Sequence, residues 1–399
     1  MKINPIISLA IVFILGVNTI SCENIIPEAP ADEDVLDGAI EGLSTAGQAR
    51  FLSGDEAFGE IFFSGNGLGP LFVANSCGSC HVGDGKGHPF TTLTRFGQTR
   101  ANVSPNLEIG GPQLQNRAIP GYTPETIPKG VPFMKFTPPA VTGLGLLAAL
   151  TDRQILDNAD PNDINDDGIS GVANYITPPD YFIPRWYHQC VNGKYIGRFG
   201  KKAATIDLLQ QTVGAYNQDM GITTTFEPVD QASRLTIDPE VTDQTVRDVI
   251  FYLRTLKARI QRSTDNARVL TGKQIFSDIN CSSCHRPEWT TPLSDIPALS
   301  NKTFYPYTDL LLHDMGSGLD DGATEGSAET YEWKTPALWG LGLSPDAQGG
   351  EFYLMHDGRA RSIEEAILIH GGEAQDSREA FQNLDVYEKE AILKFLESL

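Results

Sequence analysis

The sequence is poor in positive charge. Its 399 residues include 30 Lys and Arg but 51 Asp and Glu, which gives a formal net charge of −21. This deficit excludes nucleic-acid binding as a main activity, because too few cations are present to neutralise phosphates. The acidity favours solubility, or an acidic docking face for a basic protein partner. Hydrophobic residues at 40% and charged residues at 20% are typical of a globular chain.

The N-terminal apolar run is short. It extends from Ile6 to Val17 after Lys2, which is too short for a transmembrane helix and typical of a signal peptide. Residues 1–22 resemble a bacterial lipoprotein signal, in which Cys22 carries the lipid; ordinary secretion with a free Cys22 is the alternative. Acidic residues and prolines over 23–44 predict a tether. We therefore expect a lipid-anchored protein of the cell envelope, facing the periplasm or the outer surface.

Cysteine is scarce, and its distribution excludes a disulfide framework. Four of the six cysteines lie in two copies of C-x-x-C-H, within "NSCGSCHVGDG" (75–85) and "NCSSCHRPE" (280–288). Outside the motifs, Cys190 is a leftover thiol that we expect to be buried and inert. The cysteines are Cys22, Cys77, Cys80, Cys190, Cys281 and Cys284.

The histidine of each motif decides among three kinds of site. A zinc site would need a second ligand pair at short spacing, and none follows Cys80. A redox dithiol would need neither the histidine nor a second copy. Covalent haem attachment uses every residue, because the two thiols bond the haem and the imidazole binds the iron. The motifs thus predict two c-type haems, held by Cys77, Cys80 and His81 and by Cys281, Cys284 and His285.

The flanking segments predict a mainly α fold with two cytochrome c-like domains and long ordered loops. A short helix is expected before each motif, with Thr271 as the N-cap of the second. The chain ends in an amphipathic helix within "VYEKEAILKFLESL". A long periodic helix over "TDQTVRDVIFYLRTLKARIQ" and then "RSTDNA" separate an N-terminal haem domain with insertions (45–262) from a C-terminal one (263–399).

Several motifs occur in the order found in one known family. "GLGLLAAL", "GRFGKKA", "YTDLLLHDMG", "EWKTPALWGLG" and "HDGRARSIEEAILIHGGEA" resemble the di-haem oxidoreductase, putative peroxidase family, whose members are called thiol oxidoreductase-like. That family is related to the bacterial di-haem cytochrome c peroxidases. The resemblance implies a haem-dependent oxidoreductase and says less about the substrate.

The segment "HDGRARSIEEAILIHGG" carries a candidate sixth ligand. Ser362 and Glu365 form a capping-box pattern, which predicts a helix that starts at Ile363 and stops at Gly371. His370 then lies at the end of that helix. The resemblance implies that His370 binds the iron of the C-terminal haem. Without the resemblance, the favourable position of a histidine at the negative end of a helix dipole explains its place.

A second segment suggests calcium. In "DPNDINDDGISG", Asp163, Asn165 and Asp167 alternate before Gly168, as in the first half of an EF-hand loop. The twelfth position is Asn174 rather than Glu, so a standard EF-hand is excluded. A solvated Asp/Asn turn is the alternative.

The resemblance also exposes a missing acid. Family members read "GLGLLEAI" where this chain reads "GLGLLAAL", so Ala148 replaces an acidic residue. A peroxidase needs an acid/base group over an open haem. Asp152 is one candidate for that role in place of Ala148, whereas His88 lies too near the first motif to reach the open side of the haem. Met134 and Met220 are possible sixth ligands of the N-terminal haem, or ordinary core residues. Either a haem contact or an ordinary core or surface position would explain the following residues: His313, Met315, Trp333, Trp339, Arg359 and Arg361.

The sequence therefore predicts an exported, peroxidase-like di-haem c-type cytochrome. Electrons would pass from the C-terminal haem to an open N-terminal haem, where peroxide or another small oxidant is reduced. A basic electron-transfer protein is the expected donor, and a lipid on Cys22 the expected membrane attachment. The alternatives are a non-catalytic electron-transfer cytochrome and an anchored protein of iron or haem handling.

Overall fold

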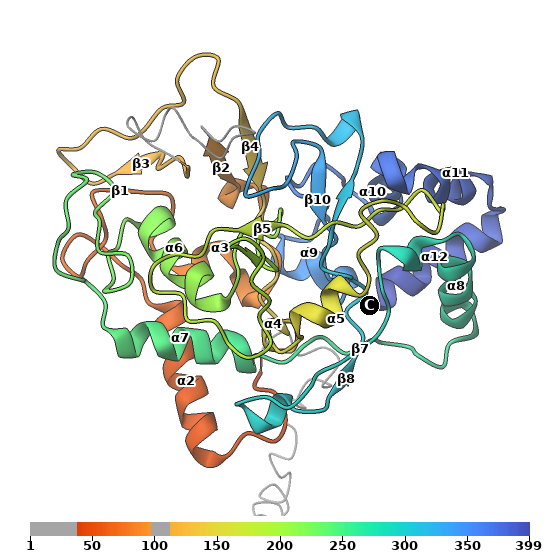
Figure 1. Cartoon of the computed structure of the whole chain (residues 1–399), viewed down its shortest axis with the longest axis horizontal. Coiled ribbons are helices and arrows are strands. Elements are labelled where there is room, and N and C mark those ends of the chain that lie inside the picture. Colours follow the sequence, from red (N-terminus) through yellow and green to blue (C-terminus); the bar gives the residue numbers. More distant parts are fainter. Residues whose placement is uncertain (1–37, 97–111) are drawn as a thin grey trace, which may run out of the picture. The chain divides into compact units, whose positions relative to one another are not determined.

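Helices dominate the regular structure, as predicted. A computed structural model describes residues 38–96 and 112–399, and Figure 1 shows the helices joined by long connections. The α-helices are α2 (Thr45–Gly59), α3 (Cys77–Cys80), α4 (Leu144–Ala148), α5 (Asp152–Leu156), α6 (Leu208–Met220), α7 (Asp243–Thr255), α8 (Ala267–Asp278), α9 (Ser344–Ala347), α10 (Ile363–Ile369), α11 (Gln375–Asn383) and α12 (Val386–Ser398).

The strands are short and form antiparallel pairs. These pairs are β1 (Leu71–Phe72) with β3 (Arg117–Ala118), β2 (Leu93–Phe96) with β4 (Phe133–Phe136), β5 (Tyr175–Ile176) with β6 (Tyr195–Ile196), β7 (Trp289–Thr290) with β8 (Thr303–Phe304), and β9 (Leu312–Asp314) with β10 (Glu332–Lys334). Such two-stranded ribbons are marginal alone. They fix the loops that lie between the helices.

One close helix crossing precedes the first motif. Helix α2 packs on α7 (Figure 1), and Gly54 makes the close approach possible, because an added Cβ would overlap the carbonyl oxygen of Asp248. One turn later, the Phe58 ring lies 5.3 Å from the ring of Tyr252. The Phe58 ring is also 6.1 Å from the His81 ring, so this crossing leads directly to the motif.

The second motif follows a crossing of the same kind. Helix α8 packs on α12 (Figure 1), and an added Cβ on Gly272 would overlap the carbonyl oxygen of Ala391. Phe276 lies 5.4 Å from the Phe395 ring and 6.1 Å from the His285 ring. The chain thus repeats one local arrangement, with a glycine and then a phenylalanine four residues on.

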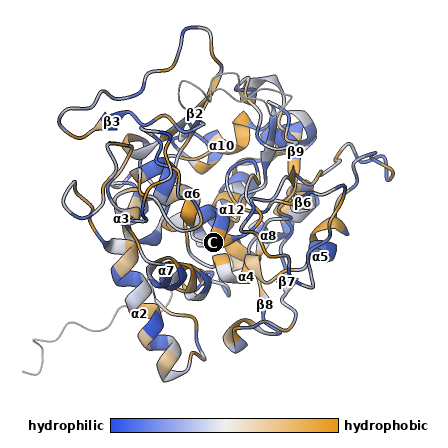
Figure 2. Ribbon diagram, turned by 60° about the vertical axis from the view of Figure 1, so that its left-hand side comes forward, coloured by the Kyte–Doolittle hydropathy of each residue, from blue (hydrophilic) through white to orange (hydrophobic). Residues whose placement is uncertain are grey.

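The helix ends follow their sequences, with two corrections. Thr271 is not an N-cap: it lies inside α8, whose N-cap Asn266 accepts from the N–H groups of Arg268 and Val269. The helix predicted over "TDQTVRDVIFYLRTLKARIQ" ends early, at Thr255. Helix α12 matches its prediction and begins with a capping box at Asp385. Figure 2 shows hydrophilic and hydrophobic residues on α2, in keeping with a helix that buries one face.

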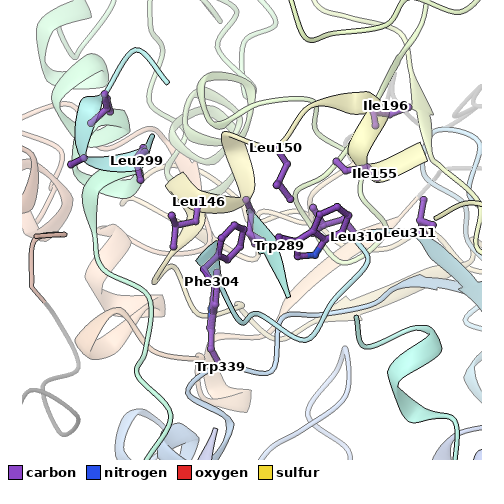
Figure 3. Packing of buried hydrophobic residues seen from close by; sticks show 13 residues of the cluster. Leu146, Leu150, Ile155, Ile196, Trp289, Leu299, Phe304, Leu310, Leu311 and Trp339 are labelled. Carbon is purple, nitrogen blue, oxygen red and sulfur yellow. The ribbon is translucent and has the colours of Figure 1, made fainter. Parts of the chain in front are cut away.

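One hydrophobic cluster joins residues from both predicted domains. In Figure 3, Leu146 and Leu150 lie near Trp289 and Phe304. Trp289 is buried, and its indole N–H donates to the carbonyl of Thr308 at 2.8 Å. The predicted domain boundary at 262/263 lies between α7 and α8. Because this hydrophobic cluster contains residues from both sides of the boundary, the division into two domains stays a prediction.

The envelope predictions fall mostly outside the described residues. The signal peptide, Cys22 and most of the tether precede residue 38. Within 38–96 and 112–399, no helix is both long and apolar enough to cross a membrane.

Candidate haem-binding site

Both C-x-x-C-H motifs line one cavity of about 640 Å³. The N-terminal motif contributes Cys77, Cys80 and His81 to its wall, and the C-terminal motif contributes Cys281, Cys284 and His285. His370 lines the same space. The structure therefore brings together all seven residues that the sequence predicted for haem.

His81 is held as a neutral metal ligand would be. Its Nδ1 donates to the carbonyl oxygen of Pro139 at 2.8 Å, since a carbonyl can only accept. This bond fixes the tautomer and leaves Nε2 without a proton. Burial lowers the pKa of His81 to about 4, against the opposing effect of the Pro139 carbonyl. The ring is therefore neutral at pH 7, with a lone pair available to iron.

His285 repeats this arrangement. Its Nδ1 donates to the carbonyl oxygen of Tyr307 at 3.0 Å. Burial, and next the charge of His370, lower the pKa of His285 to about 4. His285 and His370 both line the cavity.

His370 is oriented by its helix end. Helix α10 starts after Ser362, whose hydroxyl accepts from the N–H of Glu365, and His370 is the C-cap residue. The Glu365 carboxylate accepts from the N–H of Arg361 rather than that of Ser362, so half of the predicted capping box forms. The His370 Nδ1 donates to the Ala366 carbonyl at 2.7 Å, and burial lowers the pKa of the ring. A third neutral imidazole thus presents Nε2 within the cavity.

The motif cysteines are protonated and unbridged. The free thiols include both members of each pair. Burial, followed by the charge of Asp219, raises the pKa of Cys77 to about 12 and of Cys80 to about 11. Burial also raises the pKa of Cys281 to about 12 and that of Cys284. A reactive dithiol needs a lowered thiol pKa, so this environment argues against redox exchange.

Unpaired lysines in the cavity wall fit the carboxylates of haem. Lys86, Lys201 and Lys334 line the cavity, and the ammonium groups of Lys86 and Lys201 have no hydrogen bond or ion pair with the described residues. Burial lowers the pKa of Lys86 to about 7; burial and the charges of Lys86 and Lys334 lower that of Lys201 further. Such clustered cations are costly without an anion, and haem propionates would supply one.

His313 is committed to a different contact. It lies 3.5 Å from the Sγ of Cys284, but its Nε2 donates to Asp309 at 2.8 Å and its Nδ1 to Glu373 at 2.6 Å. Burial opposes its charge, yet these hydrogen bonds raise the pKa of His313 well above the usual value. His313 is therefore an imidazolium beside the second motif and has no free nitrogen for iron.

The acid sought near Ala148 is not at the cavity. Neither Ala148 nor Asp152 is part of its lining. The Asp152 carboxylate is fully buried, pairs with Arg198 and accepts from the N–H of Gln189 at 2.7 Å. His88 lies outside the cavity and stacks on Phe90, with ring centroids 4.6 Å apart.

Other expectations divide between core and surface. Met134 is buried and is not part of the cavity wall, although its hydrophobic cluster includes Trp333. Met220, Met315, Trp333 and Trp339 line the cavity. Arg359 pairs with Asp357 and Asp321 outside the cavity, and Arg361 lies over Tyr353, 3.9 Å from its ring centroid. Cys190 is exposed, so the expectation of a buried thiol was wrong. It directly precedes an exposed turn that hydrogen bonds between Val191 and Lys194 close.

The proposed calcium loop folds on itself. The Asp163 carboxylate accepts from the N–H groups of Asp167 and Gly168 at 3.0 and 3.2 Å, and the Asn165 side chain donates to Asp167 at 3.1 Å. Over the described part of the chain, no three His, Cys, Asp or Glu residues form a metal-binding group. The Asn165 oxygen instead accepts from Asp167 N–H at 3.1 Å.

Sequence reasoning missed several residues that face the cavity. Lys86, Asp219 and Arg378 belong to none of the motifs quoted above, and Lys201 lies in "GRFGKKA" without an assigned role; only the fold brings these residues to one space. Arg378 also donates to the His370 carbonyl at 2.9 Å, which helps to hold the end of α10. Lys86, five positions after His81 (86 − 81), was the nearest to a usable signal.

Neutral imidazoles, protonated thiol pairs and unpaired lysines around one cavity are the features of a haem-binding protein. The chain belongs to the family described as "Di-haem oxidoreductase, putative peroxidase", whose model matches residues 133–399. No curated protein matches the sequence. Among solved structures, hydrazine synthase from Kuenenia stuttgartiensis is 15% identical with a TM-score of 0.38, covering 91% of this chain and 94% of that one. That similarity is too low to define the fold.

Proposed function

We propose that this protein is an exported di-haem c-type oxidoreductase that reduces peroxide. Three half-buried histidines carry the proposal: His81, His285 and His370 each bond a backbone carbonyl through Nδ1, and all three line one cavity. Membership of the di-haem family supports two haem cofactors. Haem supplies a redox-active iron that can accept electrons and bind small ligands.

The two motifs are assigned different roles. His285 and His370 would hold the C-terminal haem from both faces, which favours electron transfer over ligand binding. Of the other histidines that line the cavity, His313 donates to two carboxylates and His356 donates from Nε2 to Asp321. An iron on His81 would keep one position open for an oxidant. Electrons from a basic donor protein would enter at the C-terminal haem, steered by the net charge of −21.

The thiols and lysines would fix the haems. Covalent attachment would use Cys77 with Cys80 and Cys281 with Cys284, whose protonated thiols remain unreacted until haem arrives. Lys86 and Lys201 would pair with propionates. Trp333, which lines the cavity, has Lys202 and His356 against its ring at 4.1 and 3.6 Å; we assign it to the wall between the motifs.

Further parts of the proposal come from the sequence. A lipid on Cys22 would anchor the protein at the cell envelope. Calcium would bind Asp163, Asn165 and Asp167 only if the loop opened, because its oxygens now accept backbone N–H groups. A non-catalytic electron-transfer cytochrome is the second candidate, favoured by Ala148 where relatives carry an acid.

Low-temperature electron paramagnetic resonance of the oxidised protein tests the assignment. We expect one low-spin haem with two histidine ligands and one high-spin haem. Cyanide should convert the high-spin signal to a new low-spin signal and leave the original low-spin signal unchanged. Two low-spin haems that ignore cyanide, together with no consumption of peroxide, would favour the electron-transfer cytochrome instead.

A further inference from the structure

Four acidic residues line the cavity, and three of them are engaged. Glu325 pairs with Arg95, and Glu227 accepts from the Tyr181 hydroxyl at 2.9 Å. Glu373 accepts from His313 at 2.6 Å and from Ser170. The fourth is Asp219, whose carboxyl group has no hydrogen bond or ion pair with another residue of the described chain.

Asp219 is fixed in place through its backbone. It lies in the last turn of α6, and its carbonyl accepts from the N–H groups of Val73 and Ala74 at 2.6 and 3.1 Å. The segment that donates these bonds continues through Ser76 into the first motif. The carboxyl group is thereby held beside the attachment cysteines, where its charge raises the pKa of both Cys77 and Cys80 after burial has done so.

The surroundings of Asp219 favour its protonated form. Burial raises its pKa to about 7, and the opposing cation is Arg95 from β2. Arg95 is already paired with Glu325 and donates to the Gln218 side chain at 3.1 Å, so it does not neutralise Asp219 directly. The position at the negative end of α6 further disfavours a carboxylate.

Four other titratable groups face this region. Cys77 and Cys80 from α3 are protonated thiols, and they become thioethers if haem is attached. The hydroxyl of Tyr216, on α6, stays protonated because burial and the charge of Cys77 raise its pKa. Arg117 from β3 acts on Cys80 and keeps its charge. Asp219 is thus the group in this neighbourhood that can exchange a proton near neutral pH.

We propose that Asp219 is the catalytic acid/base group at the N-terminal haem, in place of the acid missing at Ala148. The inference rests on the proposed function. Reduction of hydrogen peroxide consumes two protons and two electrons and forms two waters, with the electrons supplied by a one-electron donor protein. The Asp219 carboxylate takes the proton from one peroxide oxygen and returns it to the other. The O–O bond then breaks, and the leaving oxygen departs as water.

Asp219→Asn tests this role, with Asp278→Asn as the matched control. Asp278 also ends a helix, α8, but is exposed and lies outside the cavity. We expect Asp219→Asn to keep two haems and lower kcat/KM for peroxide by about 10²–10⁴-fold, the usual contribution of such a group. The wild-type profile should show one ionisation near pH 7 that the variant lacks. Unchanged turnover and an unchanged profile in Asp219→Asn would overturn the proposal while leaving the function intact.

Two readouts do not depend on turnover. Hydrogen cyanide must lose a proton as it binds, so its association with the ferric N-terminal haem should slow at least about tenfold in Asp219→Asn, with little change in affinity. The infrared band of a protonated carboxylic acid should disappear in the same variant. If the wild type consumes no peroxide, the proposed function fails; cyanide association that is equally fast in both proteins would then refute the role of Asp219 as well.

Discussion

The two C-x-x-C-H motifs share the same supporting contacts, but different residues line the cavity near each of them. Behind each motif, a phenylalanine ring lies 6.1 Å from the histidine ring, and that histidine donates to a carbonyl. In front of the second motif stands His370, at the end of α10. On the first-motif side, α6 brings Asp219 and Met220 to the cavity wall, and no histidine. The scaffold for attachment is therefore common, and the opposite wall decides what each site can do.

The difference has a local cause. Helix α10 ends at a non-helical C-cap, so His370 leaves the helix with its Nδ1 bonded back to Ala366. Helix α6 continues for 13 residues and places small or polar groups along the cavity, among them Thr212, Ala215 and Asp219. Helix α10 therefore contributes a histidine to the cavity wall, and helix α6 does not.

The largest effect should come from removing one pair of thiols. Cys281→Ala with Cys284→Ala should reduce the bound haem from two per chain to one, because no covalent attachment remains at that motif. Cys77→Ala with Cys80→Ala should do the same at the other. A pyridine haemochrome assay measures the ratio. If either double variant retained two covalent haems, that motif would have another role; Cys190→Ala is the control and should retain both.

Removing His370 should alter one haem and spare the other. His370→Ala should convert the C-terminal haem from low-spin to high-spin, since Nε2 of this residue would be its second axial ligand. Electron paramagnetic resonance should then show no haem with two histidine ligands. His88→Ala is the matched control, because His88 lies outside the cavity. An unchanged low-spin signal in His370→Ala would mean that this residue only caps α10.

The helix crossings should be equally intolerant of added volume. Gly54→Val and Gly272→Val would each drive a side chain into a backbone carbonyl, of Asp248 or Ala391. Overpacking of this kind costs about 1–3 kcal/mol. Gly59→Ala, in the same helix as Gly54, has no atom within 4 Å of the added Cβ. It should stabilise slightly, by about 0.4–1 kcal/mol. Denaturant unfolding would measure the free energy of unfolding of all three variants. If Gly272→Val did not lower that free energy, the two helix crossings would not be equivalent.

The sequence alone was enough to propose the residues for haem attachment, because their chemistry is local. Cys77, Cys80 and His81 are adjacent, as are their counterparts, so no fold is needed to recognise them. His370 was predicted from helix-end signals and a family resemblance. The structure places His370 and His285 in the wall of the same cavity. The terminal helix α12 followed from its periodicity alone.

The rest depended on contacts between distant segments. Lys86 and Lys201 are far apart in the chain, and neither has a spacing pattern that indicates a shared cavity. Asp219 looks like one of many surface acids until α6 turns it inward. Ala148 drew attention to a missing acid at a position outside the cavity lining. Resemblance could identify what had changed in the sequence but not which residue faces the site.

The smallest effect concerns an ion pair that links the two regions. Asp295 accepts from Arg254 at 2.9 Å and from Arg185 at 3.0 Å. Hydrogen bonding to Arg254 in particular, opposed by partial burial, holds the pKa of Asp295 below its ordinary value. A carboxyl group with a lowered pKa stabilises the fold above its unfolded pKa, near 3.9, and loses that contribution as pH falls through the folded value.

Asp295→Asn should therefore destabilise the protein at pH 7 and have a diminishing effect in acid. Half of the Asp295 side chain is exposed, at 51%, so solvent weakens the pair. The loss should be about 1 kcal/mol or less. Unfolding of wild type and variant at pH 7 and pH 3 would measure it, with Asp278→Asn as a carboxylate control. A difference that grew as the pH fell would mean that Asp295 is stabilised by something other than its two arginines.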